Sequence, residues 1–478
     1  MKLIFDVSDK PKAGQLVVFA LQQMLAILAA TIAVPLIIGN GLTPAAAMFG
    51  AGVGTIVYIL FTKRKSPVFL GSSFAFLGSM AAAFAGGVSM QLGMLGLIIG
   101  ALLAGLVYVV IAIVVKFVGV GWLNKLMPAV VIGPTVAIIG LSLAGNAIGD
   151  LLKGDVTKQV TEYVVSTDSG TPEIIENVSN VPVGSSYVAL VCGLITLAVV
   201  MLCSTYGKKT LRLIPFIIGI LAGYAAAAIF TVIGNICDID AFKIVDFSVF
   251  SSYMLTDGSI SLKTFVSLPD FAFVSGLKGL KEFDFSYFAT IFVAYVPVAL
   301  VVFAEHVADH KNLSSIIDHD LLEEPGLTRT LLGDGVGSIA GALFGGCPNT
   351  TYGESVACVA ITGNASVITI FAAAIGCMLF SFITPLVAFV DSIPACVMGG
   401  VCIALYGFIA VSGLKMIQDV NLDDNRNLFV VSVILIAGIG GLTLTFGDIT
   451  LTEVAAALIL GILTNVMLSK KKGNADKK

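Results

Sequence analysis

Charged residues are scarce in this chain. Only 12% of its 478 residues are Asp, Glu, Lys or Arg, whereas soluble proteins carry about 25%. Hydrophobic residues account for 57% of the sequence. This composition excludes an ordinary water-soluble domain and predicts an all-α protein that crosses the membrane many times.

Several motifs of enzymes and of ATP-driven pumps are also missing. No Gly-x-x-x-x-Gly-Lys-Ser/Thr sequence occurs, so nothing indicates ATP as the energy source. Only three histidines are present, without His-Glu-x-x-His spacing, which argues against a bound metal and a membrane-embedded metalloenzyme. The eight cysteines follow no metal or disulfide pattern, so most are expected to be small core residues. The sequence has no cluster of basic and aromatic residues of the kind that binds nucleic acids, so no nucleic acid partner is expected.

Apolar runs of about 20 residues, the length that spans a bilayer, recur along the whole chain. Alternating them from a cytoplasmic N-terminus leaves all but six of the 26 Lys and Arg residues inside, as the positive-inside rule requires. Omitting one run would scramble this distribution, so the even count is favoured. The fourteen candidates are 15–38, 43–61, 67–86, 92–116, 126–149, 185–204, 212–236, 286–310, 328–345, 348–363, 366–390, 394–412, 427–446 and 450–469.

Two long connections, 150–184 and 237–284, both fall outside and are expected to be solvated. The second one divides the chain into two runs of seven spans. Because seven is odd, the two halves must be inverted relative to each other in the membrane.

The third span of each half is broken in the same way. One begins with Ser66–Phe74 and the other with Cys347–Glu354, each with proline, then β-forming and small residues, then a helical run. Interrupted spans at matching positions of two repeats indicate a transporter binding site. We expect the two extended segments to pair as short antiparallel strands and to offer backbone groups to a ligand. Two unrelated re-entrant irregularities are the simpler alternative.

Carboxylates gather around the second broken span. Residues 285–304 carry no charge, and then Glu305 and Asp309 follow, four apart and so on one helix face. Glu354 lies at the start of the helix after the broken segment. Carboxylates clustered in a low-dielectric cavity cannot all ionise cheaply, so at least one is expected to hold a proton near neutral pH. Alternatively, 305–311 is only the charged cytoplasmic end of a helix.

Other polar residues of the spans have competing interpretations. Gln22, Gln23 and Thr31 either join helices by hydrogen bonds or face the site. Asp334 is either a structural partner in its span or a cap for a helix start. Tyr406 either packs or contacts the ligand.

Several strings around these residues resemble the nucleobase/ascorbate transporters, and most closely their uracil permease branch. The resemblance covers essentially the whole chain. The string Pro-Asn-Thr-Thr-Tyr-Gly-Glu is specific to this family, and it occurs together with the other matching strings in the list that follows. The strings are Ala304–His306, Glu323–Leu327 with Arg329, Pro348–Glu354, Gly71–Phe76, Val397–Gly400 and Leu405–Gly407.

The resemblance implies fourteen segments arranged as two inverted repeats of seven. Spans 1–4 and 8–11 would form a core domain, and spans 5–7 and 12–14 a gate domain that also supplies a homodimer interface. The core domain would comprise 1–120 and 286–392, the gate domain 121–236 and 393–469, with an extracellular loop at 237–285 and a basic cytoplasmic tail at 470–478.

The resemblance also implies a set of ligand contacts. Glu305 and Glu354 would hydrogen-bond the base, and aromatic rings would pack around it. Backbone groups at the two broken spans would complete its polar edge. The residues implied to bind the base are Glu305, Glu354, Gly353, Phe74, Tyr352, Ser73 and Tyr406.

The resemblance implies no cofactor, with the proton as the coupling ion. Asp309 and Glu305 are the expected coupling residues, supported by Gln23 and Asp334. The core would move against the gate as in an elevator.

The sequence departs from the family pattern at several of these positions. Gln22-Gln23 replaces a Gln-His pair, and Ser355–Ala357 replaces Asn-x-Gly. Asp309 and Asp334 match the purine branch, where uracil permeases carry histidine and asparagine. Glu354 points back to uracil, because the purine branch has glutamine there.

These observations predict a proton-coupled uracil symporter of the cytoplasmic membrane with both termini in the cytoplasm. The nearest alternative is a xanthine or uric acid symporter on the same scaffold. An anion exchanger or channel of similar architecture would be expected to present a cation at the half-helix site, where Glu354 lies instead.

Overall fold

The computed structural model describes residues 3–119, 128–166, 173–208, 210–254, 260–446 and 449–469. Two compact units are distinguished by their internal packing. The first comprises Met1–Leu143, Val266–Val387 and Leu405–Lys478, and the second Ala144–Phe265 and Ala388–Ala404.

The first unit opens with the elements of the N-terminal half. Its helices begin at clear signals: Thr43 Oγ1 accepts the N–H of Ala46 at 3.3 Å at the start of α2, and Ser89 Oγ accepts that of Leu92 at 3.1 Å at the start of α4. The elements are α1 (Ala13–Ile38), α2 (Pro44–Phe61), β1 (Leu70–Ser72), η1 (Phe74–Phe76), α3 (Leu77–Ala83), η2 (Ala85–Gly87), α4 (Met90–Val118) and α6 (Ala129–Ser142).

The C-terminal half contributes the remaining elements of this unit. Two of them, α17 (Thr384–Asp391) and α18 (Ala395–Met416), continue from one unit into the other. The others are α12 (Ala272–Gly276), η5 (Leu277–Lys281), α13 (Phe285–Ile317), η6 (Leu322–Gly326), α14 (Leu327–Gly345), β4 (Asn349–Thr351), α15 (Gly353–Thr362), α16 (Val367–Phe380), α19 (Asn425–Ile439), β5 (Leu444–Phe446), β6 (Ile449–Leu451) and α20 (Glu453–Leu468).

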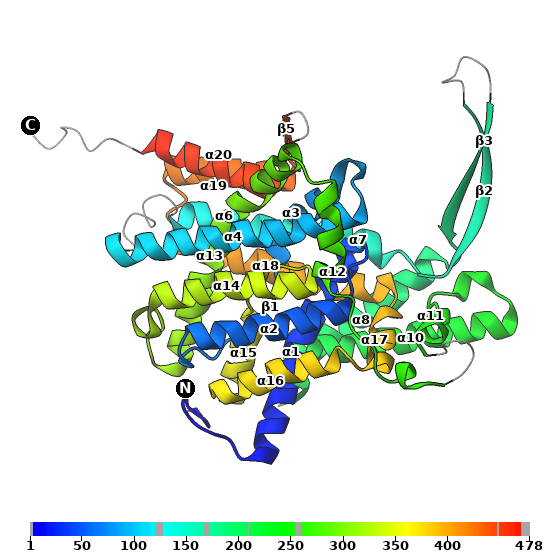
Figure 1. Ribbon diagram of the computed structural model, residues 1–478, viewed down its shortest axis with the longest axis horizontal. Helices are drawn as coiled ribbons and strands as arrows, with labels where there is room; N and C mark the ends of the chain where they lie inside the picture. Colours follow the sequence, from blue (N-terminus) through cyan, green and yellow to red (C-terminus); the bar gives the residue numbers. More distant parts are fainter. Residues whose placement is uncertain are drawn as a thin grey trace, which may run out of the picture. The chain divides into compact units, whose positions relative to one another are not determined.

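Within this unit α4, α14, α2 and α16 lie side by side (Figure 1). Glycines bring the α2 and α14 backbones together. A Cβ on Gly54 would come within 2.7 Å of the Gly337 carbonyl oxygen, and one on Gly50 would collide with that of Gly341. Small residues four apart on both helices are the usual means of close helix packing in membranes.

The two broken spans cross where β1 and β4 pair. They are antiparallel, with Leu70 opposite Thr351 and Ser72 opposite Asn349. The ladder is extended by Ser73 N–H donating to the Pro348 carbonyl at 2.9 Å and Tyr352 N–H donating to that of Phe69 at 3.1 Å. The short strands predicted in the third and tenth segments are therefore present. The third segments of the two halves run in opposite directions, as inversion requires.

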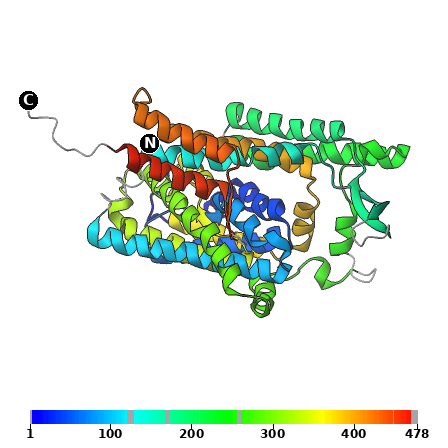
Figure 2. The same ribbon diagram turned by 90° about the horizontal axis from the view of Figure 1, so that it is seen from above.

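The second unit is built around α8 (Ser186–Tyr206) and α10 (Pro215–Cys237), which lie side by side (Figure 2). A β-hairpin, β2 (Thr157–Ser166) and β3 (Glu173–Pro182), occupies much of the connection predicted as a solvated loop. The shorter helices of this unit are α7 (Ala144–Leu151), α9 (Thr210–Leu213), η3 (Asp240–Phe242), α11 (Ser248–Met254) and η4 (Leu262–Thr264).

The predicted spans correspond to helices of the structure. Among the described residues, eight helices are long and apolar enough to cross a membrane, and five further apolar helices are shorter. With α14 they account for the fourteen predicted segments. The eleventh span is interrupted between α16 and α17, because Pro385 supplies no N–H there. The eighth helix continues to Ile317, beyond the predicted end at residue 310.

Candidate functional site

The two predicted coupling carboxylates lie along one side of α13. Glu305 and Asp309 are both partly exposed, whereas His306 and His310, each one residue further on, are buried. Since α13 continues to Ile317, these residues lie well inside a helix. The helix therefore does not end at 305–311.

Asp309 contacts the second broken span directly. Thr351 Oγ1, at the end of β4, donates a hydrogen bond of 2.8 Å to Oδ2 of Asp309. A Cβ built on Gly353 would lie 3.9 Å from Oδ1 of the same carboxylate. The Asp309 carboxylate therefore lies beside the junction between β4 and α15.

Glu354 occupies the first turn of α15, which starts without a side-chain cap. Its carboxyl group interacts with its own backbone N–H, and Gly353 beside it is exposed. The first N–H groups of a helix have no partner inside it and carry the positive end of its dipole. This end of α15 is suited to a polar ligand that replaces the local contact of Glu354.

The ionisable groups that act on Glu305 are all acids: Asp309, Glu354 and Asp334. Like charges in an apolar setting repel strongly, so protonation of one acid eases ionisation of another. The cluster can hold a proton and can pair with N–H groups of a ligand. These are the two properties required of a proton-coupled site for a polar heterocycle.

Aromatic rings lie next to the crossing. Phe74 begins the short helix after β1, and its ring lies edge-on to Tyr406 of α18, with the centroids 5.8 Å apart. Tyr352 is held differently, because its hydroxyl donates to the Ser72 carbonyl at 2.8 Å and its ring packs where Gly71 has no side chain. Phe74 and Tyr406 therefore meet each other, while Tyr352 and the buried Ser73 belong to the strand crossing.

Gln23 of α1 reaches the same crossing. Its Nε2 donates to Oγ of Ser355, which also accepts the N–H of Phe69 at 3.0 Å. Ser355 therefore ties α1, the first broken span and α15 together at one hydroxyl oxygen. Sequence reasoning noted both Gln23 and Ser355 as departures from the family pattern but did not predict that they touch.

A buried histidine pair on α13 was not predicted as a structural unit. The rings of His306 and His310 stack with centroids 4.0 Å apart, and Nδ1 of His310 donates to the His306 carbonyl at 2.7 Å. Nε2 of His310 lies 2.6 Å from the Tyr58 hydroxyl of α2, which is itself 2.7 Å from Oγ of Ser66. The pair thus fastens α13 to α2.

Asp334 belongs to this histidine pair. Its Oδ2 lies 2.7 Å from Nδ1 of His306, whose Nε2 lies 3.0 Å from Oγ1 of Thr330. A hydrogen bond between Nδ1 of His306 and Oδ2 of Asp334 requires one hydrogen, so one of these two atoms carries a proton. Oδ1 of Asp334 is buried without a hydrogen-bond partner among the described residues, which makes an unpaired negative charge costly there.

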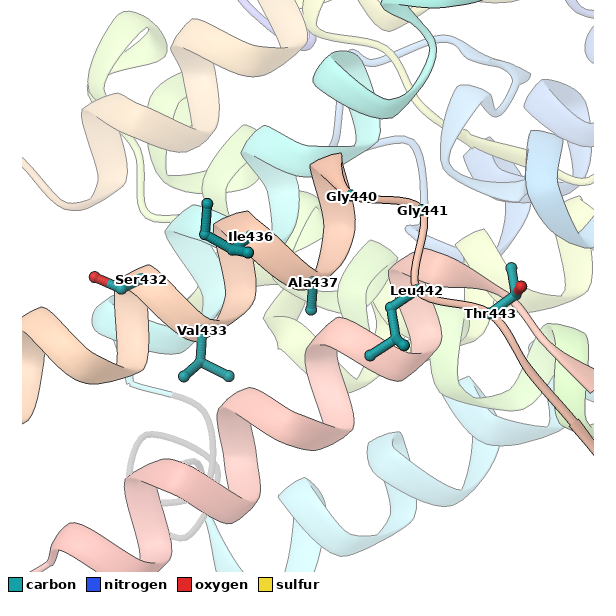
Figure 3. Close-up of a pocket in the computed structure, with 8 residues that line it drawn as sticks. All are labelled: Ser432, Val433, Ile436, Ala437, Gly440, Gly441, Leu442 and Thr443. Atoms are coloured by element: carbon teal, nitrogen blue, oxygen red, sulfur yellow. The ribbon is translucent and has the colours of Figure 1, made fainter.

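A surface hollow at the end of α19 offers no alternative substrate site. The hollow has a volume of about 680 Å³ and is lined by eight residues, of which only Ser432 and Thr443 carry polar side chains (Figure 3). It contains no group able to titrate. Within the described part of the chain, no cluster of His, Cys, Asp and Glu could hold a metal ion.

Comparison with known proteins identifies the class and the family. A model described as the permease family, covering xanthine and uracil permeases, matches residues 14–446. With its many apolar helices the chain is a multi-pass membrane transporter and not an enzyme. It belongs to the xanthine/uracil permease family, the nucleobase/ascorbate transporters.

The curated relatives are similar over nearly their whole length. The uracil permease of Bacillus caldolyticus is 36% identical over an alignment of 478 positions, which covers 99% of this chain and 97% of the relative. That of Bacillus subtilis is 34% identical over 98% of this chain and 96% of the relative. That of Escherichia coli K12 is 33% identical over 95% and 92%, respectively.

The similar solved structures are membrane transporters of low sequence identity. The transmembrane domain of the cyanobacterial bicarbonate transporter BicA matches with a TM-score of 0.58 and 13% identity, covering 96% of this chain and 100% of that chain. SLC26A9 matches with a TM-score of 0.58 and 12% identity, covering 96% and 67%. This likeness concerns the fold alone, and both have seven plus seven segments. The predicted fold class is thus confirmed.

Proposed function

We propose that this chain is a proton-coupled uracil symporter. One observation carries the proposal: Glu305, Asp309 and Glu354 converge on the uncapped start of α15, beside the two crossed strands. Similarity along the whole chain to proteins named uracil permeases supports uracil as the substrate.

In the proposed complex the base lies between α13 and the start of α15. Glu305 and Glu354 accept its ring N–H groups, and the N–H of Gly353 faces one of its carbonyl oxygens. Phe74 and Tyr406 supply the apolar wall, because their rings already meet near the crossing. Tyr352 and Ser73 hold the strands that present these groups.

Proton coupling is proposed to reside on Asp309 together with Glu305. Binding of a proton relieves the repulsion within the acid cluster and so favours binding of a neutral base. Release of the proton on the other side restores this repulsion and weakens binding. No further cofactor is required by this cycle.

We further propose that the crossed strands and their helices move as one body against the gate segments. Backbone pairing of β1 with β4 makes the first and second broken spans a single mechanical piece, which supports a rigid carrier. The proposal includes a homodimer through the gate segments in the cytoplasmic membrane. Both termini would lie in the cytoplasm, where most of the basic residues cluster.

Two other transport functions remain to be separated by experiment. Xanthine or uric acid is favoured by Asp309 and Asp334, which match the purine branch. The fold is shared with anion transporters. Anion exchange is nevertheless disfavoured, because the ionisable groups that act on Glu305 are all acids.

The proposal is tested by thermal stabilisation of the purified protein with uracil, thymine, xanthine, hypoxanthine, uric acid and ascorbate. A ligand at 100 times its Kd adds about 2.7 kcal/mol, which a melting curve resolves. Stabilisation by uracil alone would support the assignment, and stabilisation by xanthine or uric acid alone would replace it with the purine alternative. Uptake of labelled uracil in cells lacking their own permease, with and without a protonophore, then tests coupling.

A further inference from the structure

We propose that the protein carries a second binding site, for the headgroup of an anionic phospholipid, at the membrane end where α1 begins. The site is a cavity of about 430 Å³ between the N-terminal strap, residues 3–9, the end of α2 and the start of α16. Its volume falls within the range of about 300–1,000 Å³ that is usual for ligand pockets. It lies away from the carboxylate cluster and does not depend on the substrate proposed above.

The strap is held in place by backbone hydrogen bonds, so the cavity has a defined wall. Ile4 N–H donates to the Gly363 carbonyl at 2.7 Å, and Ala365 N–H donates to the Phe5 carbonyl at 2.9 Å. Further along, Ser366 Oγ donates to the Asp9 carbonyl at 2.6 Å. The strap therefore runs along the connection between α15 and α16.

Two cationic residues line the cavity. Lys10 follows the strap, and Arg64 lies in the turn after α2. In the described part of the chain neither of them forms an ion pair, whereas the neighbouring Lys65 pairs with Glu324. A buried or paired cation would have no need of a ligand, but these two are exposed and available.

The nearest acids of the strap are turned to its backbone. Oδ1 of Asp6 accepts the N–H of Val7 at 2.7 Å, and Oδ2 of Asp9 accepts the N–H of Asp6 at 2.7 Å. These contacts are made within the strap itself. Neither acid lines the cavity, and the charged residues that do line it are Lys10 and Arg64.

Arg64 is fixed by an unusual turn. Lys63 and Arg64 both have left-handed backbones, with φ of 53° and 60°, which side chains with a Cβ disfavour. The N–H of Arg64 donates to the Ile59 carbonyl at 2.9 Å. Unfavourable backbone conformations persist where the surrounding structure requires them, often at binding sites.

The remaining walls are apolar, and this selects a lipid over a free anion. Leu60 and Phe371 are 62% and 40% exposed beside the two cations, and Val7 and Ile368 complete the wall. α2 ends at Phe61 and α16 begins at Val367, so the cavity lies at the level where membrane helices end. A headgroup phosphate would meet Lys10 and Arg64, and an acyl chain would follow the apolar wall.

The test measures binding of phosphatidylglycerol to delipidated protein in a non-ionic detergent, by native mass spectrometry and by melting temperature. Phosphatidylcholine and inorganic phosphate are the parallel probes. The double variant Lys10→Gln/Arg64→Gln should bind phosphatidylglycerol about 25-fold more weakly, since each cation near an anionic lipid contributes about fivefold. The single variants should each lose about fivefold.

Lys116→Gln/Lys415→Gln is the matched control, because it removes two exposed cations at other helix ends. It should bind phosphatidylglycerol within twofold of the wild type, and Lys10→Arg/Arg64→Lys should do the same. Equal binding of phosphatidylcholine, or undiminished binding by the Gln double variant, would overturn the proposal. Equal protection by inorganic phosphate would reassign the cavity to a free anion, against the lipid.

Discussion

The hydrogen bond between Thr351 and Asp309 gives the sharpest test of where the coupling proton resides. Replacing Thr351 with valine removes the hydroxyl while preserving shape at a buried strand position. A hydrogen bond to a charged acceptor contributes about 1.5–3 kcal/mol. The hydroxyl donates to Oδ2 over 2.8 Å, so its loss disfavours the ionised carboxylate relative to the protonated one.

The expected result is a shift in the pH dependence of uracil uptake. An energy of about 1.5 kcal/mol corresponds to about one pH unit. Because Thr351→Val makes the proton harder to release, the pH at which uptake falls should rise by about one unit. The maximal rate should fall too, since release inside the cell is slower. Initial rates of labelled uracil uptake between pH 5 and 9 measure both effects.

Two controls surround this experiment. Thr351→Ser keeps the hydroxyl and should retain the wild-type profile. Thr350→Val makes the same chemical change one residue earlier on β4, where the side chain points to the opposite face of the strand. If Thr351→Val and Thr351→Ser gave the same pH midpoint, Asp309 would not carry the coupling proton through this contact.

Four further outcomes are expected. Glu354→Gln should weaken uracil binding at least tenfold by calorimetry, because an acceptor of the base N–H is lost; binding equal to that of a Glu282→Gln control would show that it is not a ligand group. Asp309→Asn should retain uracil exchange in proteoliposomes but lose accumulation driven by a pH gradient, and persistent accumulation would move coupling elsewhere. Gly50→Leu should lower the melting temperature strongly, because its side chain would collide with the α14 backbone, and an unchanged melting curve would contradict the observed packing. Burial raises the pKa of the Asp155 carboxyl from 3.8 to about 6, so the folded protein holds this proton more tightly than the unfolded chain. The free energy of unfolding should therefore fall, by up to about 3 kcal/mol, as the pH rises between these two pKa values. Asp155→Asn should abolish this part of the pH dependence of melting.

The segments were predictable because their signal is local. Hydrophobic length defines each span, and proline followed by β-forming residues marks the two breaks around Ser72 and Asn349. The facing of Glu305 and Asp309 follows from their spacing of four on a helix. Each of these inferences needs only residues within one or two turns of each other.

The partners across the site were not predictable in the same way. Gln23 and Ser355 are 332 residues apart, and Tyr58 and His310 are 252 apart. Periodicity states which face of a helix a residue occupies but not which helix that face meets. The strap that covers the end of α15 was missed for a related reason, since a short polar segment before the first span carries no periodic signal.

The two faces of α13 make different contacts. The acids at 305 and 309 lie on the side of the candidate site, where Asp309 accepts a hydrogen bond from Thr351 of the crossing. The histidines at 306 and 310, one residue on, are buried and fully engaged with Asp334, Thr330 and Tyr58. A helix fastened on one side cannot easily rotate when a carboxylate on the other side gains or loses a proton. In the proposed cycle a change of charge on Asp309 therefore acts on the junction of β4 and α15, at which Glu354 stands.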